Sequence, residues 1–173
     1  MFLTPDHLVE KLYLKEGSRV ADIGSGSGAY VVSLARAVGE KGKVFCVDVH
    51  RDALHTLHDS MIKAGYLNTD IIWADIEKGI HIEDYDLDAV VLSNVLFQLE
   101  NIQKALKEVS RVLKPEGEVL VVDWKGSFGG IGPHSGHVVS ESRAEEELRE
   151  AGFRVRERLP AGDYHYAFIA IKS

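Results

Sequence analysis

The segment from Val20 to Tyr30, with the sequence VADIGSGSGAY, constrains the fold more than any other part of the chain. An apolar, partly β-branched run leads into three glycines at alternate positions, and an apolar helical pattern begins directly afterwards. Glycine lets the backbone turn sharply and lets a ligand lie against it, because no Cβ intervenes. Open parallel sheets bind nucleotide-like ligands at such a loop between a strand and a helix. The segment therefore predicts an α/β fold with a ligand at this turn.

Apolar periodicity predicts alternating strands and helices along the rest of the chain. The predicted strands cover residues 19–23, 44–47, 71–74, 87–93, 119–122, 153–159 and 164–171. The predicted helices cover residues 5–13, 31–38, 102–113 and 142–152, and one more runs through Leu54, Leu57 and Met61 to Gly65. This alternation is typical of a Rossmann-like, doubly wound sheet of seven strands. The last two strands are joined by only four turn residues, so they pair antiparallel, because a parallel crossover needs about a dozen.

Three local signals refine this prediction. Residues 114–117, with the sequence KPEG, are expected to end the preceding helix, since proline cannot continue it. Ser142 and Glu145 form a predicted capping box for the next helix. The glycine-rich stretch 126–140 lacks periodicity, and long irregular loops in compact domains are usually functional.

Composition narrows the class of protein. The 173 residues suit one domain, and we expect residues 1–17 to form an N-terminal helix or lid and 126–140 a substrate-side loop. A net charge of −7 disfavours a nucleic-acid partner, and no apolar run is long enough for a membrane span. The first residues show no signal-peptide pattern, and the single cysteine, Cys46, suits a reducing compartment. We therefore expect a cytoplasmic protein; its oligomeric state is not predicted.

Asp22, two residues before the first glycine, selects among nucleotide-like ligands. The glycine spacing also fits a permissive NAD pattern, which is a weak signal alone. However, a carboxylate at the loop would repel a pyrophosphate and attract an ammonium or a sulfonium. Asp48 and Asp75 end the next two predicted strands, where they can accept hydrogen bonds from a ribose and from an adenine amino group. Each acid alone could be a helix cap or a solvated turn residue, but together they favour S-adenosylmethionine (SAM).

At these residues the sequence resembles the class I SAM-dependent methyltransferases. Residues 20–28 resemble the SAM-binding loop, 73–76 the adenine-flanking segment and 93–96 the stretch that lines the methyl donor. Residues 111–117 are similar to a segment of the quinone-biosynthesis (type 11) branch, which more often has a second glycine where this chain has Glu116. The resemblance implies a strand order of 3-2-1-4-5-7-6 with the last strand antiparallel. It also implies SAM as cofactor, S-adenosylhomocysteine as product, and these cofactor-binding residues: Asp22, Gly24, Ser25, Gly26, Gly28, Tyr30, Asp48, Val49, Ala74, Asp75, Ile76, Ser93 and Asn94.

The methyl acceptor is left open by the sequence, although histidines near the predicted ligand edge are candidates. His134 and His137 lie in the 126–140 loop, His165 starts the last strand, and Asp123 ends the fifth. They could supply a general base or a metal site, or they could simply pack and hydrogen-bond. We assign His134, His137 and His165 as candidate catalytic residues and assign no metal. The predicted function is methyl transfer to a small molecule; the alternatives are a protein methyltransferase and a non-catalytic SAM- or NAD-binding module.

Overall fold

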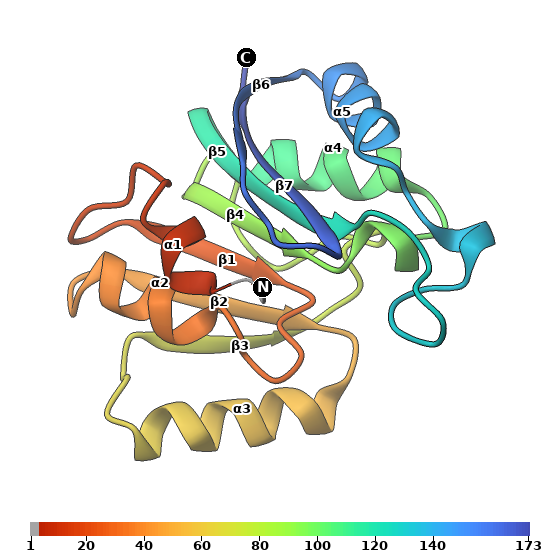
Figure 1. Ribbon diagram of the computed structural model, residues 1–173. Helices are drawn as coiled ribbons and strands as arrows, with labels where there is room; N and C mark the ends of the chain where they lie inside the picture. Colours follow the sequence, from red (N-terminus) through yellow and green to blue (C-terminus); the bar gives the residue numbers. More distant parts are fainter. Residues whose placement is uncertain (1–3) are drawn as a thin grey trace.

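Seven strands form one mixed sheet in the order β3-β2-β1-β4-β5-β7-β6 in the computed structural model, which describes residues 4–173 (Figure 1). The strands are β1 (Arg19–Ile23), β2 (Lys43–Asp48), β3 (Thr69–Trp73), β4 (Leu87–Ser93), β5 (Leu113–Trp124), β6 (Phe153–Leu159) and β7 (His165–Lys172). β7 pairs antiparallel with both β5 and β6, and the pairings among β1 to β5 are parallel. The predicted order and the antiparallel last strand are confirmed.

Helices cover both faces of the sheet (Figure 1). The α-helices are α1 (Pro5–Val9), α2 (Val31–Val38), α3 (Arg51–Lys63), α4 (Ile102–Val112) and α5 (Glu141–Glu150), and the short 3-10 helices are η1 (Leu96–Gln98) and η2 (Ser135–His137). Apolar side chains of α1, α2 and α3 pack on one face, and those of α4 and α5 pack on the other. None of the helices within residues 4–173 has the length and apolar character needed to cross a bilayer.

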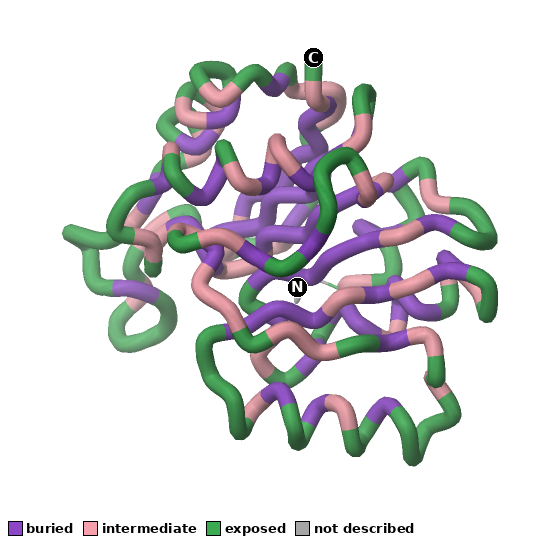
Figure 2. Tube along the Cα trace, turned by 180° about the vertical axis from the view of Figure 1, so that it is seen from behind, coloured by how far each residue is buried: buried purple, intermediate pink, exposed green. Residues whose placement is uncertain are grey.

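The central strands read as continuous apolar runs because both of their faces are covered. In β4, Val91 packs in the α1–α3 layer and Leu92 in the α4–α5 layer, as the two-residue repeat of a strand requires. Figure 2 shows this buried centre as purple tube through the middle of the molecule, with green exposed turns around it.

The structure corrects three boundaries. α1 ends at Val9 instead of extending to residue 13. The capping residue of α5 is Ser140, whose side chain accepts from the Arg143 N–H, and not Ser142. β5 begins at Leu113, because this residue pairs with Leu87 across a register shift, so residues 114–117 belong to the strand and form its irregular first part.

The carboxyl ends of β1 to β5 meet at one edge of the sheet, where a ligand is expected to bind. The antiparallel β7 starts at this same edge, since His165 is in register with Trp124 at the end of β5. Long loops after β1, β4 and β5 therefore gather above the edge (Figure 1). Residues 1–3 of the predicted lid lie outside the described residues.

Candidate active site

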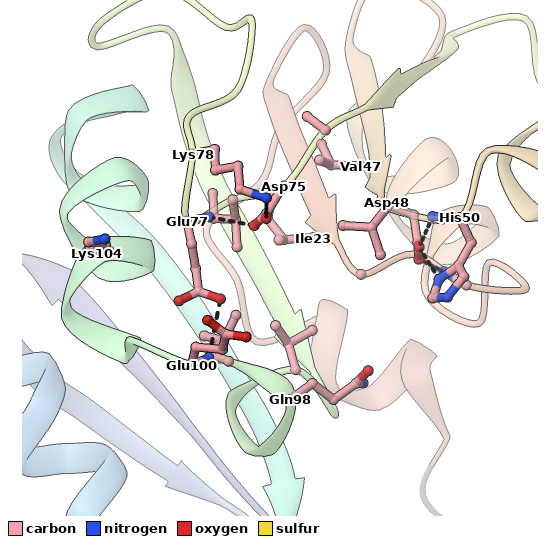
Figure 3. A pocket seen from close by; sticks show the side chains of 17 residues that line it. Ile23, Val47, Asp48, His50, Asp75, Glu77, Lys78, Gln98, Glu100 and Lys104 are labelled. Carbon is pink, nitrogen blue, oxygen red and sulfur yellow. Dashed lines mark hydrogen bonds and ion pairs between the residues drawn. The ribbon is translucent and has the colours of Figure 1, made fainter.

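A pocket of about 530 Å³ opens at the carboxyl ends of β1, β2 and β3 (Figure 3). Its volume falls within the range of about 300–1,000 Å³ that is usual for cofactor and drug-sized ligand sites. The predicted cofactor-binding residues that line it are Gly24, Gly26, Asp48, Val49, Ala74, Asp75 and Ile76. Residues from three consecutive strand ends thus come together as the sequence predicted, and we call this cavity the cofactor pocket.

Asp48, the last residue of β2, is held as an oriented carboxylate at the wall of the cofactor pocket. Its Oδ2 accepts a hydrogen bond from the Gly26 N–H at 2.9 Å, and its Oδ1 accepts from the His50 N–H at 2.9 Å. The His50 ring Nδ1 lies 2.9 Å from the same Oδ1 (Figure 3). Burial tends to raise the pKa of Asp48, but the two backbone N–H groups and the His50 ring together outweigh it and hold the pKa below its usual value. The carboxylate is therefore ionised and suits the hydroxyl groups of a ribose.

Asp75 follows β3 on another wall of the cofactor pocket and is also ionised. Its Oδ1 accepts from the Glu77 N–H at 3.0 Å, and its Oδ2 pairs with the Lys78 ammonium at 2.9 Å (Figure 3). The hydrogen bond from Lys78, followed by that from Glu77, lowers the pKa of Asp75. Each oxygen keeps a lone pair that can accept a further donor, such as an adenine amino group.

The glycine loop allows a ligand and neighbouring side chains to approach the backbone closely. Gly24 has a φ of 73°, and a Cβ there would lie 2.6 Å from Cγ2 of Val95. Gly28 has a φ of 84° and packs against Leu57. The Ser25 hydroxyl is buried and donates to the Asp22 carbonyl at 2.7 Å, which tightens the turn. Only glycine fits these two positions, in conformation and in space.

Asp22 lies beneath the glycine loop, at the end of β1, and does not line the cofactor pocket itself. It is only 2% exposed, and burial, with a smaller contribution from Asp48, raises its pKa to about 7. A buried carboxyl group in this state gains its charge most readily when a cation lies near it. The position agrees with the predicted attraction of a cationic ligand.

Sequence reasoning missed the far wall of the cofactor pocket. This wall comes from the residues after Asp75, from η1 and from the segment that leads into α4 and the start of that helix: Glu77, Lys78, Gln98, Leu99, Glu100 and Lys104. These residues show no spacing that marks a ligand site. The Glu77 carboxylate accepts hydrogen bonds from the N–H groups of Glu100 and Asn101 at 3.2 and 2.6 Å. These hydrogen bonds join the segment after Asp75 to the segment that leads into α4.

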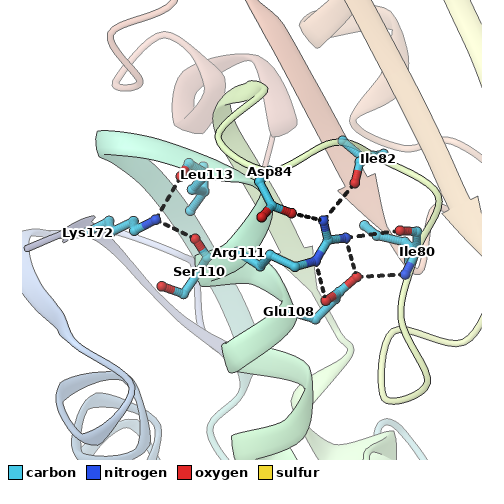
Figure 4. A network of polar contacts seen from close by, with 8 residues as sticks. All are labelled: Ile80, Ile82, Asp84, Glu108, Ser110, Arg111, Leu113 and Lys172. Atoms are coloured by element: carbon cyan, nitrogen blue, oxygen red, sulfur yellow. Dashed lines mark hydrogen bonds and ion pairs between the residues drawn. The ribbon is translucent and has the colours of Figure 1, made fainter.

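Arg111 on α4 fixes the chain segment that leads from this wall into β4 (Figure 4). Its guanidinium donates to the carbonyls of Ile80 and Ile82 at 3.0 and 2.9 Å and to Asp84 at 2.6 Å. Two further hydrogen bonds, at 2.8 and 2.6 Å, reach Glu108 one helical turn earlier. The polar network orders the irregular segment 76–86, whose first residues line the cofactor pocket.

A second, smaller pocket of about 230 Å³ lies at the carboxyl ends of β4 and β5, and we call it the acceptor pocket. The predicted cofactor residues Tyr30, Ser93 and Asn94 line this pocket and not the first. Its other lining residues come mainly from β5, β7 and the connecting loops: Pro5, Ala29, Val122, Trp124, Ile131, Ala161, Asp163, Tyr164 and His165. The loop 126–140 contributes Ile131, and α1 contributes Pro5.

His165 is the candidate catalytic histidine that faces the acceptor pocket. Its ring centroid lies 4.2 Å from that of Trp124, and its Nε2 is buried without a hydrogen-bond partner among the described residues. Burial, and then the charge of Lys125, lower the pKa of His165 below 6.5. The imidazole is therefore neutral at pH 7 and can accept a proton.

The other two candidate histidines lie elsewhere, so the expected convergence of three histidines and Asp123 is not observed. His134 is exposed and lines neither pocket, and His137 lies on a separate hollow beside Phe97 and Arg143. Asp123 is fully buried and accepts from the Leu96 and Trp124 N–H groups at 2.9 and 2.8 Å, so it anchors η1. Within residues 4–173, no group of three or more His, Cys, Asp or Glu side chains is arranged to hold a metal ion.

Comparisons with known proteins agree with this arrangement. A family model described as a methyltransferase domain matches residues 14–157. A ubiquinone/menaquinone biosynthesis C-methyltransferase (UbiE) of Vibrio vulnificus strain YJ016 is 33% identical over 111 residues, which are 64% of this chain and 42% of that relative. The chain thus spans less than half the length of such curated relatives.

Solved structures show the same fold over nearly the whole chain. A SAM-dependent methyltransferase from Aquifex aeolicus has a TM-score of 0.91 and 30% identity, covering 99% of this chain and 91% of its own. The [4+2]-cyclase SpnF has a TM-score of 0.84 at 19% identity, over 97% of this chain and 79% of its own, and that likeness is one of fold only. The family match, supported by the strand order and the cofactor pocket, shows that this chain belongs to the methyltransferase domain family.

Proposed function

We propose that this chain is a SAM-dependent methyltransferase that acts on a small-molecule acceptor. One observation carries the proposal: two loops each line both pockets. The glycine loop lines the cofactor pocket with Gly24 and Gly26 and the acceptor pocket with Ala29 and Tyr30. The loop after β4 lines the cofactor pocket with Val95 and the acceptor pocket with Asn94. A donor and an acceptor would therefore meet across these loops, as an in-line transfer requires.

The residues of the cofactor pocket fit SAM. Asp48 and Asp75 present ionised carboxylates to hydroxyl and amino groups, and the buried Asp22 favours a cation beneath the glycine loop. Three carboxylates of this kind would repel the pyrophosphate of a dinucleotide. Bound SAM would supply an electrophilic methyl group on a positively charged sulfur.

His165 is proposed as the general base for an acceptor that arrives protonated. The acceptor atom would take the methyl group of bound SAM, which would leave as S-adenosylhomocysteine, and the acceptor's proton would pass to Nε2 of His165. The buried, unpartnered Nε2 and the lowered pKa of His165 support this role.

A small acceptor is favoured over a macromolecule by the volume and charge of the site. The acceptor pocket measures about 230 Å³, and the chain carries a net charge of −7, which disfavours nucleic acid. We further propose that residues 1–173 act as one catalytic domain, with residues 1–17 and 126–140 as its cover. The buried free thiol of Cys46 suits a cytoplasmic setting.

Calorimetry with S-adenosylhomocysteine and with NADH tests the cofactor assignment. We expect S-adenosylhomocysteine to bind and NADH not to bind. Asp48→Asn removes charge-assisted hydrogen bonds worth about 1.5–3 kcal/mol, so it should weaken binding at least about tenfold. Asp70→Asn is the matched control, because Asp70 is exposed on β3 and pairs with Lys43 away from the pocket. Binding of NADH in place of S-adenosylhomocysteine would contradict the proposal.

Labelling of a cell lysate with methyl-tritiated SAM tests the acceptor class. Label in the small-molecule fraction is the expected result. Label confined to protein would support the alternative of a protein methyltransferase, and tight cofactor binding without any transfer would support a non-catalytic module.

A further inference from the structure

We propose that Asn94 selects the methyl acceptor, and that the acceptor is a compact, flat molecule that offers an O–H or N–H hydrogen. This inference rests on the proposed function, because it names the substrate class for the pocket beside the cofactor. Sequence resemblance assigns Asn94 to cofactor binding, and this inference assigns it to recognition of the acceptor instead.

Two buried polar atoms without partners point to hydrogen-bond donors on the acceptor. Oδ1 of Asn94 and Nε2 of His165 are the two side-chain atoms of the acceptor pocket that are buried and have no hydrogen-bond partner among the described residues. A buried acceptor atom left unpaired costs about 1–3 kcal/mol, so a ligand that supplies a donor recovers that cost. A ligand without a polar hydrogen does not recover it and is rejected.

The backbone holds Asn94 in place and so fixes the direction of its side chain. The Asn94 N–H donates to the Val122 carbonyl at 2.8 Å, and its own carbonyl accepts from the Gln98 side chain at 2.6 Å. Its φ of 57° is a left-handed conformation, which asparagine adopts more readily than most residues other than glycine.

The walls of the acceptor pocket describe the shape of the ligand. Aromatic rings from Tyr30, Trp124 and Tyr164 and aliphatic side chains such as Val122 and Ile131 form most of the lining, which suits a flat ring. The volume of about 230 Å³ is below the range of about 300–1,000 Å³ for drug-sized ligands.

The test compares phenol and fluorobenzene as probes of the full chain saturated with S-adenosylhomocysteine, using ligand-observed NMR. The two molecules have nearly the same shape, but only phenol has a polar hydrogen. One hydrogen bond contributes about 0.5–1.5 kcal/mol, so we expect phenol to bind about 2- to 13-fold more tightly than fluorobenzene.

Asn94→Gly is the decisive variant, because glycine accepts the left-handed backbone and only the side chain is lost. In this variant the ratio of the affinity for phenol to the affinity for fluorobenzene should fall to near one, while the affinity for S-adenosylhomocysteine stays within about twofold of that of the unaltered chain. His165→Phe keeps a ring against Trp124 and removes Nε2, and it should also reduce the ratio; His81→Phe, at an exposed histidine outside both pockets, should not.

The outcomes separate this inference from the proposed function. Failure of S-adenosylhomocysteine to bind the unaltered chain overturns both. With that ligand bound, an unchanged ratio in Asn94→Gly or absence of phenol binding overturns the acceptor assignment alone.

Discussion

Replacing Asp22 by asparagine should stabilise the ligand-free protein above neutral pH, and the structure gives the size of the effect. Asp22 is 2% exposed, and burial, aided by Asp48, raises its pKa from 3.8 to about 7. The folded chain therefore binds more protons than the unfolded chain between these values, so its stability falls as the pH rises through this window. The slope is about 1.4 kcal/mol for each pH unit, which gives a loss of about 2–3 kcal/mol between pH 5 and pH 7.5.

An asparagine side chain cannot ionise, so the Asp22→Asn variant lacks this loss. Urea unfolding without ligand, at pH 5 and pH 7.5, measures this difference. From pH 5 to pH 7.5, the free energy of unfolding of the variant should rise by about 2–3 kcal/mol relative to that of the unaltered chain, which corresponds to roughly 5–10 °C in melting temperature. Asp70→Asn, at an exposed residue, is the control for loss of a charge. The reasoning is refuted if the unaltered chain and Asp22→Asn show the same dependence on pH.

The same variant should bind S-adenosylhomocysteine more weakly, because the buried negative charge is lost. In the unaltered chain, affinity for this ligand should rise as the pH increases through about 7, since binding favours ionised Asp22. Calorimetry across pH 6–8.5 should show this rise, and the variant should show a flatter profile. Asp22 would then lower the stability of the ligand-free protein and strengthen the binding of the ligand.

The remaining predictions concern strain, a buried ion pair and catalysis. Glu116→Gly should raise stability by about 1 kcal/mol in thermal unfolding, because Glu116 has a φ of 61° and its contact with Arg154, at 3.5 Å, is exposed. Arg156→Met should lower the free energy of unfolding by about 2–4 kcal/mol, since Glu118, whose carboxylate lies 3.1 Å from the guanidinium, stays buried without a counter-charge. Methyl transfer should decline at acidic pH as His165, whose pKa is lowered by burial, becomes protonated, and His165→Gln should lower the rate at pH 7.5 by about 100-fold or more and remove that decline. An unchanged pH–rate profile in that variant would return His165 to a structural role.

The order of strands and helices was predictable because it depends on local patterns. Continuous apolar runs mark strands that are covered on both faces, and a four-residue connection forces the last two strands into an antiparallel pair. The strand order itself came from the resemblance to class I methyltransferases, and the structure confirms it. The boundaries of β5 and α5 were missed, because pairing with β4 and the capping contact of Ser140 depend on the assembled chain.

Arginines 154, 156 and 158 show how pairing can change the meaning of a pattern. Their spacing indicates one face of a solvated edge strand, but β6 contains a register shift between Val155 and Glu157. Arg156 instead lies largely buried beside Glu118, and its guanidinium donates to the Lys11 carbonyl at 2.6 Å. A residue far along the chain thus anchors the segment that follows α1.

The local chain specifies the ligand edge and the sign of the charge that it favours, because glycines and carboxylates follow directly after their strands. Folding decides how the site is divided. Gly24 and Tyr30 lie in one loop, yet they line different pockets. Asn94 and Val95 are adjacent in the chain, and they also line different pockets. His165 reaches the acceptor pocket only because β7 pairs with β5, whereas His134 and His137 remain outside it. Side-chain direction and long-range pairing are set by packing in three dimensions, so no spacing in the chain encodes them.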